Sequence, residues 1–399
     1  MTTRRRISQR KTSLEKSEPE AFGRPRSVKN SLFSLHKHVY NANRVFSTPK
    51  VPTLLAIIVL ISVACYLALR ELPYRFVQKQ SAIPATHDDL EARDASIFTV
   101  QGIPGKGKGI IAVRDIKRGE VVLQERPLFV LPSEITTSPT ALITRHLSLL
   151  TPYEHAQFYN LSYVNFPPDL DPENDFAELA LAIFQTNAVS TGVNSVGIFP
   201  RMARLNHGCS SAFNVVYTWR EKEGMLMVHA IRDIQKGEEL LTTYTDTKRP
   251  RDQRRAYLLH QYSFHCTCDV CSLPDKKSKE SDRRLKSMSE LHAQFASWGG
   301  GTIDGVQAIE IVKRIWEVGS EEGYLSERGR LAADAAWVAA AHSDAASTNA
   351  WARLAEEWFG YEVGVDSEQV SEMRTLQTQP EGHLAWASRQ AIRIPTPDV

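Results

Sequence analysis

The stretch Arg204-Leu-Asn-His-Gly-Cys-Ser-Ser-Ala-Phe-Asn214 decides the fold of this chain. Within it, Asn206-His207-Gly208-Cys209 brings an amide, an imidazole and a thiol into four consecutive residues. The glycine between the imidazole and the thiol lets the backbone come close to another group. We expect a glycine-rich stretch upstream, a tyrosine downstream and a cysteine cluster further on to fold back onto this one.

The glycine-rich stretch is Gly102-Ile-Pro-Gly-Lys-Gly-Lys-Gly109, and it follows a predicted strand at Ile97–Val100. Four glycines in eight residues predict a tight turn, or a backbone that lets a ligand approach. Gly102, Gly107 and Lys108 have the spacing of a phosphate-binding P-loop, but residue 109 is glycine where a P-loop has Ser or Thr. A plain hairpin turn is therefore favoured over a nucleotide triphosphate site.

Four of the five cysteines form a candidate metal site. Cys65 lies in an apolar run near the N-terminus, which leaves Cys209, Cys266, Cys268 and Cys271. A tetrahedral structural zinc takes four thiolates, and the Cys-x-Cys-x₂-Cys cluster supplies three from one turn, with Cys209 as the candidate for the fourth. The alternative is two disulfides or ordinary buried thiols, but disulfides between cysteines this close in sequence would be strained. The sequence thus predicts a zinc ion that pins residues 260–271 over the Asn-His pair.

Apolar periodicity predicts a β-rich domain that contains a helical insert. Ala112–Glu120 is matched by Ala230–Glu238, and each predicts strand, Asp-Ile-x-x-Gly turn, strand, so we expect two similar hairpins. Val215–Trp219 and Met225–Ile231 predict another hairpin, and the basic run Lys248–Arg255 predicts the solvated start of a helix. Helical spacing is found between the matched segments at residues 141–150, 152–161 and 176–184.

The first 95 residues differ in composition from the rest. Residues 1–50 hold twelve Lys and Arg against three Glu, which predicts a basic, disordered arm. Val51–Leu69 is nineteen residues without a charge, and at about 1.5 Å per residue it nearly matches a hydrocarbon core of about 30 Å. The sequence thus predicts a transmembrane helix at 51–70, a linker at 71–95 and a single-pass membrane protein. The long preceding arm argues against a signal peptide, and the lack of a polar face argues against a buried core helix.

The rest of the composition is that of a globular protein. With 42% hydrophobic and 24% charged residues, the 399-residue chain can bury a core, and its net charge of +2 gives no reason to expect direct nucleic-acid binding. Residues 275–399 begin with a charged linker and are then largely helical. A TPR-like cap and a plain helical bundle are equally consistent with the pattern. This region is expected to wall a substrate cleft or to dock a protein partner.

Four motifs in order resemble those of the SET-domain protein lysine methyltransferases. They are Gly105-Lys-Gly-Lys-Gly109, Asn206-His-Gly-Cys209, Glu238/Glu239 through Tyr244, and Cys266-Thr-Cys-Asp-Val-Cys271. Their order, their spacing and the long insert are most similar to the SMYD branch and its fungal relatives, without the MYND zinc finger, for which no spare cysteines exist. The resemblance implies an α+β fold with a SET domain at 96–250, a post-SET zinc region at 251–274 and a helical region at 275–399.

The resemblance also implies an activity, the transfer of a methyl group from S-adenosyl-L-methionine to a lysine of a protein substrate. It assigns catalysis to Tyr244, through orientation and electrostatic preorganisation, and to Tyr262 as a wall of the lysine channel. A packed aromatic is the alternative for Tyr262, and a helix C-cap is the alternative for Asn187. The implied cofactor-binding residues are Lys106, Gly107, Lys108, Asn187, Asn206, His207, Tyr244 and Phe264. The implied metal ligands are Cys209, Cys266, Cys268 and Cys271.

Two function classes fit this sequence: an active, membrane-anchored lysine methyltransferase, or a catalytically weak SET protein that serves as an anchored scaffold. The family usually continues Cys-x-Pro-Asn, whereas Ser210-Ser-Ala-Phe-Asn214 follows here, so the turn after Cys209 must differ. The basic arm predicts that the C-terminal part lies across the membrane, yet zinc thiolates suit a reducing compartment. The side of the membrane and the organelle therefore stay open.

Overall fold

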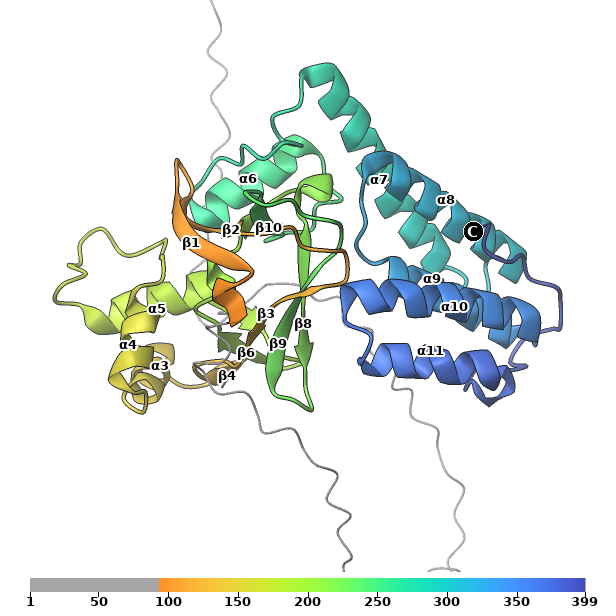
Figure 1. Cartoon of the computed structure of the whole chain (residues 1–399), viewed down its shortest axis with the longest axis horizontal. Coiled ribbons are helices and arrows are strands. Elements are labelled where there is room, and N and C mark those ends of the chain that lie inside the picture. The colour runs from red at the N-terminus through yellow and green to blue at the C-terminus, as the bar shows by residue number, and fades with distance from the viewer. Residues whose placement is uncertain (1–92, 399) are drawn as a thin grey trace, which may run out of the picture.

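The structure is a computed structural model that describes residues 93–398. Its strands lie in the middle of the molecule, with a helical insert on one side and a C-terminal group of helices on the other (Figure 1). The α+β architecture expected from the sequence is observed. The insert comprises α3 (Pro139–Leu147), α4 (Pro152–Tyr159) and α5 (Phe176–Asn187).

The strands of the described part form three small sheets. The first has the order β1 (Phe98–Ile103), β2 (Gly107–Ala112), β10 (Glu239–Thr242), β7 (Asn206–His207). The second has the order β3 (Val121–Glu125), β9 (Met225–Ala230), β8 (Val215–Arg220), and the third has β4 (Val130–Pro132), β6 (Ser195–Ile198), β5 (Ala188–Ser190). All neighbouring strands are antiparallel except β7 and β10, which are parallel.

The hairpin expected around Glu221–Gly224 is confirmed, because β8 and β9 pair from Val215 with Ala230 to Arg220 with Met225. The two matched Asp-Ile-x-x-Gly segments do not form hairpins. Each instead carries the chain between the first and second sheets, and the two segments pair with each other. Ile116 and Ile234 form an antiparallel bridge, with backbone hydrogen bonds of 2.8 and 2.9 Å. Both isoleucines are buried in the core between the sheets, which explains why the same pattern occurs twice.

The C-terminal helices pack on a core of their own and on the strands. They are α7 (Asp275–Ala296), α8 (Gly305–Glu322), α9 (Arg328–Ala341), α10 (Ala345–Glu362) and α11 (Glu368–Thr378). Alanines of α9 let α10 approach closely, and the bundle core includes Trp351 and Trp358. A separate apolar cluster joins Phe213 and Ile231 of the strand domain to Met288, Val318 and Tyr324 of the helices. The helical region thus shares buried surface with the strand domain.

Shorter elements complete the path of the chain. α6 (Arg251–Tyr262) links the strand domain to the cysteine cluster, and Ser263, with a left-handed φ of 55°, ends it. Three 3₁₀ turns lie at Met202–Arg204 (η1), Ser210–Ala212 (η2) and Pro380–Gly382 (η3). The first two flank the Asn206-His207 strand, so the chain enters and leaves this site through tight turns.

The prediction of a membrane-anchored fold and of a single-pass membrane localisation is corrected here. Between residues 93 and 398, no helix is both long and apolar enough to cross a membrane. The predicted basic arm, the predicted span at 51–70 and most of the predicted linker lie outside the described residues. We therefore withdraw the transmembrane helix from the fold class. Length, lack of charge, basic flanks and the lack of a polar face favour a span in this uncharged run, but these sequence features do not establish a membrane helix.

Candidate functional site

The site is built where two strands far apart in sequence run side by side. In the parallel pair of β7 and β10, Asn206 lies opposite Leu241 and His207 opposite Thr242. The Asn-His pair therefore lies beside the strand that leads into Tyr244. The backbone amide of Gly208 then donates to the carbonyl of Thr242 at 2.8 Å. A Cβ at Gly208 would lie 2.8 Å from the backbone nitrogen of Phe213, so only glycine fits this turn.

His207 joins the tyrosine segment to the cysteine cluster. Its Nδ1 accepts a hydrogen bond from the backbone N–H of Tyr244 at 3.0 Å, and its Nε2 lies 3.1 Å from the Sγ of Cys209. Burial lowers the pKa of His207 to about 4, so the ring is neutral at neutral pH. Because Nδ1 is an acceptor, the neutral ring carries its proton on Nε2, which points to the Cys209 sulfur.

Two aromatic rings, of Tyr244 and Phe264, lie beside this imidazole, and Tyr262 packs on Tyr244. The Tyr244 ring lies 5.4 Å from the His207 ring and 5.1 Å from Tyr262, and Phe264 lies 6.3 Å from His207. The Tyr244 hydroxyl donates to the carbonyl oxygen of Leu205 at 2.6 Å. Burial raises the pKa of Tyr244, and it raises that of Tyr262 to about 12, so both phenols stay protonated at neutral pH.

A carboxylate ties the glycine-rich turn to Asn206. Glu239 pairs with the Nζ of Lys106 at 2.6 Å through one oxygen, and its other oxygen accepts from the Asn206 amide at 2.9 Å. A Cβ added at Gly109 would meet the Asn206 amide nitrogen at 2.7 Å. In contrast, a Cβ at Gly105 or Gly107 would meet nothing within 4 Å, and both have a left-handed φ, of 73° and 74°. The turn is thus tightly packed at its end and open at its tip.

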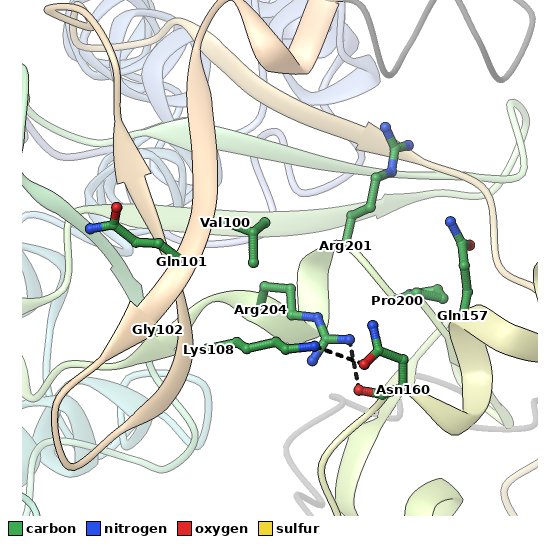
Figure 2. Close-up of a pocket in the computed structure, with 9 residues that line it drawn as sticks. All are labelled: Val100, Gln101, Gly102, Lys108, Gln157, Asn160, Pro200, Arg201 and Arg204. Carbon is green, nitrogen blue, oxygen red and sulfur yellow. Dashed lines mark hydrogen bonds between the residues drawn. The ribbon is translucent and has the colours of Figure 1, made fainter.

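A cavity of about 400 Å³ opens beside this turn. Its side chains are mostly cationic or carry an amide: Figure 2 shows those of Lys108 and Arg204 converging on Asn160. The Lys108 ammonium donates to the Asn160 side-chain oxygen at 2.7 Å, and Arg204 donates to the Asn160 carbonyl at 2.9 Å. The cavity is lined by Val100, Gln101, Gly102, Lys108, Gln157, Asn160, Pro200, Arg201 and Arg204.

Two cations of this cavity, Lys108 and Arg204, form no ion pair with a carboxylate among residues 93–398. Arg201, a third cation of the wall, is paired with Asp94 at 2.6 Å, whereas Lys108 and Arg204 bond only to oxygens of Asn160. Arg204 is itself buried, with 8% of its surface exposed, and burial lowers its pKa despite the nearby charge of Glu125, so a further anion beside it would be favoured. The cavity is therefore suited to a carboxylate or a similar anion.

The four sequence-predicted cysteines come together in the fold. Their sulfur atoms all lie within 4.8 Å of one another, and all four residues are buried. Cys209 Sγ lies 3.6 Å from that of Cys271 and 4.0 Å from that of Cys266, so these are free thiols rather than disulfides. A tetrahedral zinc with Zn–S distances of about 2.3 Å places its sulfurs about 3.8 Å apart. The cluster thus fits a zinc ion in donor type, in number and in spacing.

Two arginines of α6 surround the cysteine cluster. Arg255 donates to the carbonyl oxygens of Cys266 and Cys271 at 3.2 and 2.9 Å. Arg254 is fully buried. Burial lowers the pKa of Arg254, but negative charge on the sulfurs of Cys209 and Cys271 and on Asp282, 3.3 Å from the guanidinium, outweighs burial and raises it. The expectation of a solvated basic helix is therefore wrong at Arg254, which is buried, pairs with Asp282 and faces the cysteine cluster.

The predicted cofactor residues are not all brought together. Asn206, His207, Tyr244 and Phe264 form one group. Asn187 instead ends α5, where its side-chain amide donates to the carbonyls of Ile183 and Ser162, both at 2.7 Å, much as a helix-capping side chain does. Sequence reasoning missed Asn160, Arg204 and Arg254. Arg204 lies two residues before Asn206, and this proximity was the one signal that could have drawn attention to it.

Comparison with known proteins finds similar sequences over the region that holds this site. Residues 107–245 match the family model of the SET domain. The chain carries a SET domain. It is 29% identical over 292 residues to "Histone-lysine N-methyltransferase set5" of Schizosaccharomyces pombe, which covers 73% of this chain and 86% of that protein. The predicted resemblance to SET-domain methyltransferases is thereby confirmed.

Similarity to other SET proteins covers shorter stretches. The chain is 31% identical over 139 residues to "Histone-lysine N-methyltransferase SMYD3" of Homo sapiens, which is 32% of each protein. It is 36% identical over 97 residues to "N-lysine methyltransferase SMYD2" of Homo sapiens, covering 24% of this chain and 22% of that protein. The solved SET domain of LSMT, bound to lysine and AdoHcy, covers 74% of this chain and 90% of its own at 11% identity, with a TM-score of 0.27, which is too low to support an argument.

Proposed function

We propose that this chain is an S-adenosyl-L-methionine-dependent protein lysine N-methyltransferase. The observation that carries the proposal is the junction at Asn206-His207, where a SET-domain motif contacts Tyr244 on one side and a four-cysteine cluster on the other. The relatives that match the SET region are named as lysine methyltransferases. A pure scaffold has no need of a buried tyrosine and imidazole in this arrangement.

The methyl donor fits the open side of the glycine-rich turn. We propose that Lys106, Gly107, Asn206 and His207 hold it, with Phe264 against its adenine. Its carboxylate would then lie in the cationic cavity, between Lys108 and Arg204, whose side chains donate to oxygens of Asn160 and carry the positive charge that favours an anion. Asn187 stays in the proposed donor-binding set as a prediction from the family resemblance. Its side-chain amide already donates to the carbonyls of Ser162 and Ile183. When bound, the donor supplies an electrophilic methyl group.

Tyr244 and Tyr262 are proposed to orient the lysine amine. Because burial keeps both phenols protonated, neither acts as a base. The amine, with an ordinary pKa of about 10.4, must lose its proton to solvent before it attacks. The Tyr244 hydroxyl donates its proton to the Leu205 carbonyl, which leaves the oxygen lone pairs free to face the reacting methyl group. Its contribution is preorganised electrostatics rather than proton transfer.

Zinc is proposed to be structural. Four thiolates complete a tetrahedral shell and leave no open position for a substrate, which is the pattern of structural sites. The ion would hold the residues that carry Tyr262 and Phe264 against the Asn-His pair. We propose the SET domain at 96–250, the zinc region at 251–274 and the helical region at 275–399. Partner docking by the helical region stays a prediction.

A methyl-transfer assay tests the proposal. The full chain is incubated with labelled S-adenosyl-L-methionine and a mixture of lysine-containing proteins, and Tyr244→Phe is compared with the wild type. We expect Tyr244→Phe to lower the transfer rate by about 10²–10³-fold, the effect of removing one preorganised polar group from an active site. Tyr361→Phe, a tyrosine of α10 outside the site, is the matched control and should keep the wild-type rate.

Two outcomes of that assay would overturn the enzyme reading. One is an absence of label on protein with the wild type, and the other is equal transfer by the wild type and Tyr244→Phe. Absent transfer together with intact donor binding would favour the alternative of a catalytically weak SET scaffold. Label found only in small amines would instead show a substrate that is not a protein.

A further inference from the structure

The residue after Cys209 is held in a strained conformation. Ser210 has a φ of 47°, in the left-handed region that side chains other than glycine seldom adopt, and only 1% of its surface is exposed. Such a conformation persists only where the surroundings hold it. The Ser210 hydroxyl donates to an oxygen of Glu322 at 2.8 Å. This bond joins the cysteine-bearing turn of the SET domain to the last residue of α8.

Both carboxylate oxygens of Glu322 accept hydrogen bonds. The oxygen that accepts from Ser210 also accepts from the Ser281 hydroxyl at 2.6 Å, and the other oxygen accepts from Arg284 Nε at 2.8 Å. The side chain of Glu322 is only 2% exposed. A carboxylate at a helix C-terminus is disfavoured by the helix dipole, so α8 itself gains nothing from it. Its partners in α7 and in the SET domain are what stabilise it there.

The turn between α8 and α9 contacts the segments that follow both strands of the site. Gly323 has a left-handed φ of 72°, and a Cβ there would lie 3.0 Å from the Ser211 side chain. Tyr324 packs edge-to-face on Phe213, with ring centroids 5.8 Å apart. Glu327 pairs with Lys248 at 2.8 Å. One turn thus touches the segment that follows Cys209 and the segment that follows Tyr244.

We propose that Glu322 is a positioning residue for the methyl-donor site, acting through Ser210 on Cys209 and on the Asn-His pair. This proposal rests on the proposed function. The hydrogen bond from Ser210 to Glu322 ties the left-handed backbone after Cys209 to the helical region. The C-terminal helices are therefore part of the site and not an appended module.

Two serine variants separate positioning from general stability. Ser210→Ala removes the bond between the domains, whereas Ser281→Ala removes a bond to the same Glu322 oxygen within the helical region. In the zinc-loaded full chain, we expect Ser210→Ala to speed zinc release to a chelator about tenfold and to raise the Kd for S-adenosyl-L-methionine about tenfold, the scale of a lost outer contact to a metal site. Ser281→Ala should lower the Tm but change neither quantity.

A second pair of variants separates the proposed role of Glu322 from a general loss of folding. Glu322→Gln is compared with Glu362→Gln, another buried glutamate, which accepts from the backbone amides of Arg328 and Gly329 at the start of α9. Glu322→Gln should speed zinc release and raise the Kd for S-adenosyl-L-methionine as Ser210→Ala does. The double variant should show little further change in these two quantities, because both single variants disturb the same Ser210–Glu322 bond. Equal zinc release by Ser210→Ala and Ser281→Ala would overturn the proposal. Failure of the wild type to bind the donor would instead overturn the proposed function, since zinc release is measured without donor.

Discussion

At the residue scale, His207 couples three functions in one ring. Its Nδ1 is bonded to the Tyr244 backbone, its Nε2 faces Cys209, and its flat side lies among the aromatic residues. A single neutral imidazole thus contacts both the cysteine cluster and the tyrosine segment. The neighbouring glycine lets the backbone reverse between the ring and the thiol.

Gly109 gives a prediction at the same scale. A methyl group there would overlap the Asn206 amide and the Ile103 side chain, at 2.7 and 2.6 Å. We expect Gly109→Ala to displace Asn206 and to weaken binding of S-adenosyl-L-methionine by at least about tenfold, with a stability loss of about 1–3 kcal/mol from overpacking. Calorimetric titration measures the affinity, and chemical denaturation measures the free energy of unfolding.

Gly300→Ala is the control for this variant, because a Cβ there meets only a carbonyl oxygen at 3.5 Å, an ordinary contact. It should leave donor binding unchanged. Unaltered affinity in Gly109→Ala, in a folded protein, would show that the position of Asn206 does not matter for the donor.

At the element scale, strand β9 carries a buried histidine. His229 is fully buried and neither ring nitrogen has a hydrogen-bond partner within the described part of the chain. Burial lowers its pKa to about 4, and the nearby Arg220 adds to this. The unfolded chain takes up a proton near pH 6.5, whereas the folded chain does so only near pH 4. The stability that this residue contributes is therefore present above pH 6.5 and is lost as the pH falls to about 4.

The expected loss over this range is on the order of 3 kcal/mol. We predict that His229→Gln flattens the dependence of the free energy of unfolding on pH between 6.5 and 4, as measured by denaturant titration at several pH values. His260→Gln, at an exposed position on α6, should keep the wild-type slope. Parallel curves for the wild type and His229→Gln would contradict the prediction.

The sequence predicted individual helices, strands and motifs better than it predicted the tertiary contacts between them. The β8–β9 hairpin and the helices of the insert follow from local periodicity. The pairing of the two Asp-Ile-x-x-Gly segments does not, because a bridge between residues 118 positions apart leaves no local signal. The same limit explains Arg254. A basic run indicates solvent exposure, and only the fold shows that one arginine faces thiolates.

At the scale of the whole molecule, the C-terminal helices share buried surface with the SET domain. The apolar cluster around Phe213 and Tyr324 and the Ser210–Glu322 bond lie on the same side of the site. The sequence predicted these helices but left their role open between a cleft wall and a docking surface. Helical periodicity identifies the apolar face of a helix, but it does not show which domain covers that face.

We propose that one stretch, Asn206 to Cys209, joins the methyl-donor pocket to the four-cysteine zinc site. The most direct test is a calorimetric titration of S-adenosyl-L-methionine into the full chain, before and after its metal is removed by a chelator. The structure predicts binding of one donor per chain, weakened at least about tenfold by metal removal and restored by added zinc. Absence of binding by the metal-loaded chain, or an unchanged affinity after the metal has been lost, would contradict the claim.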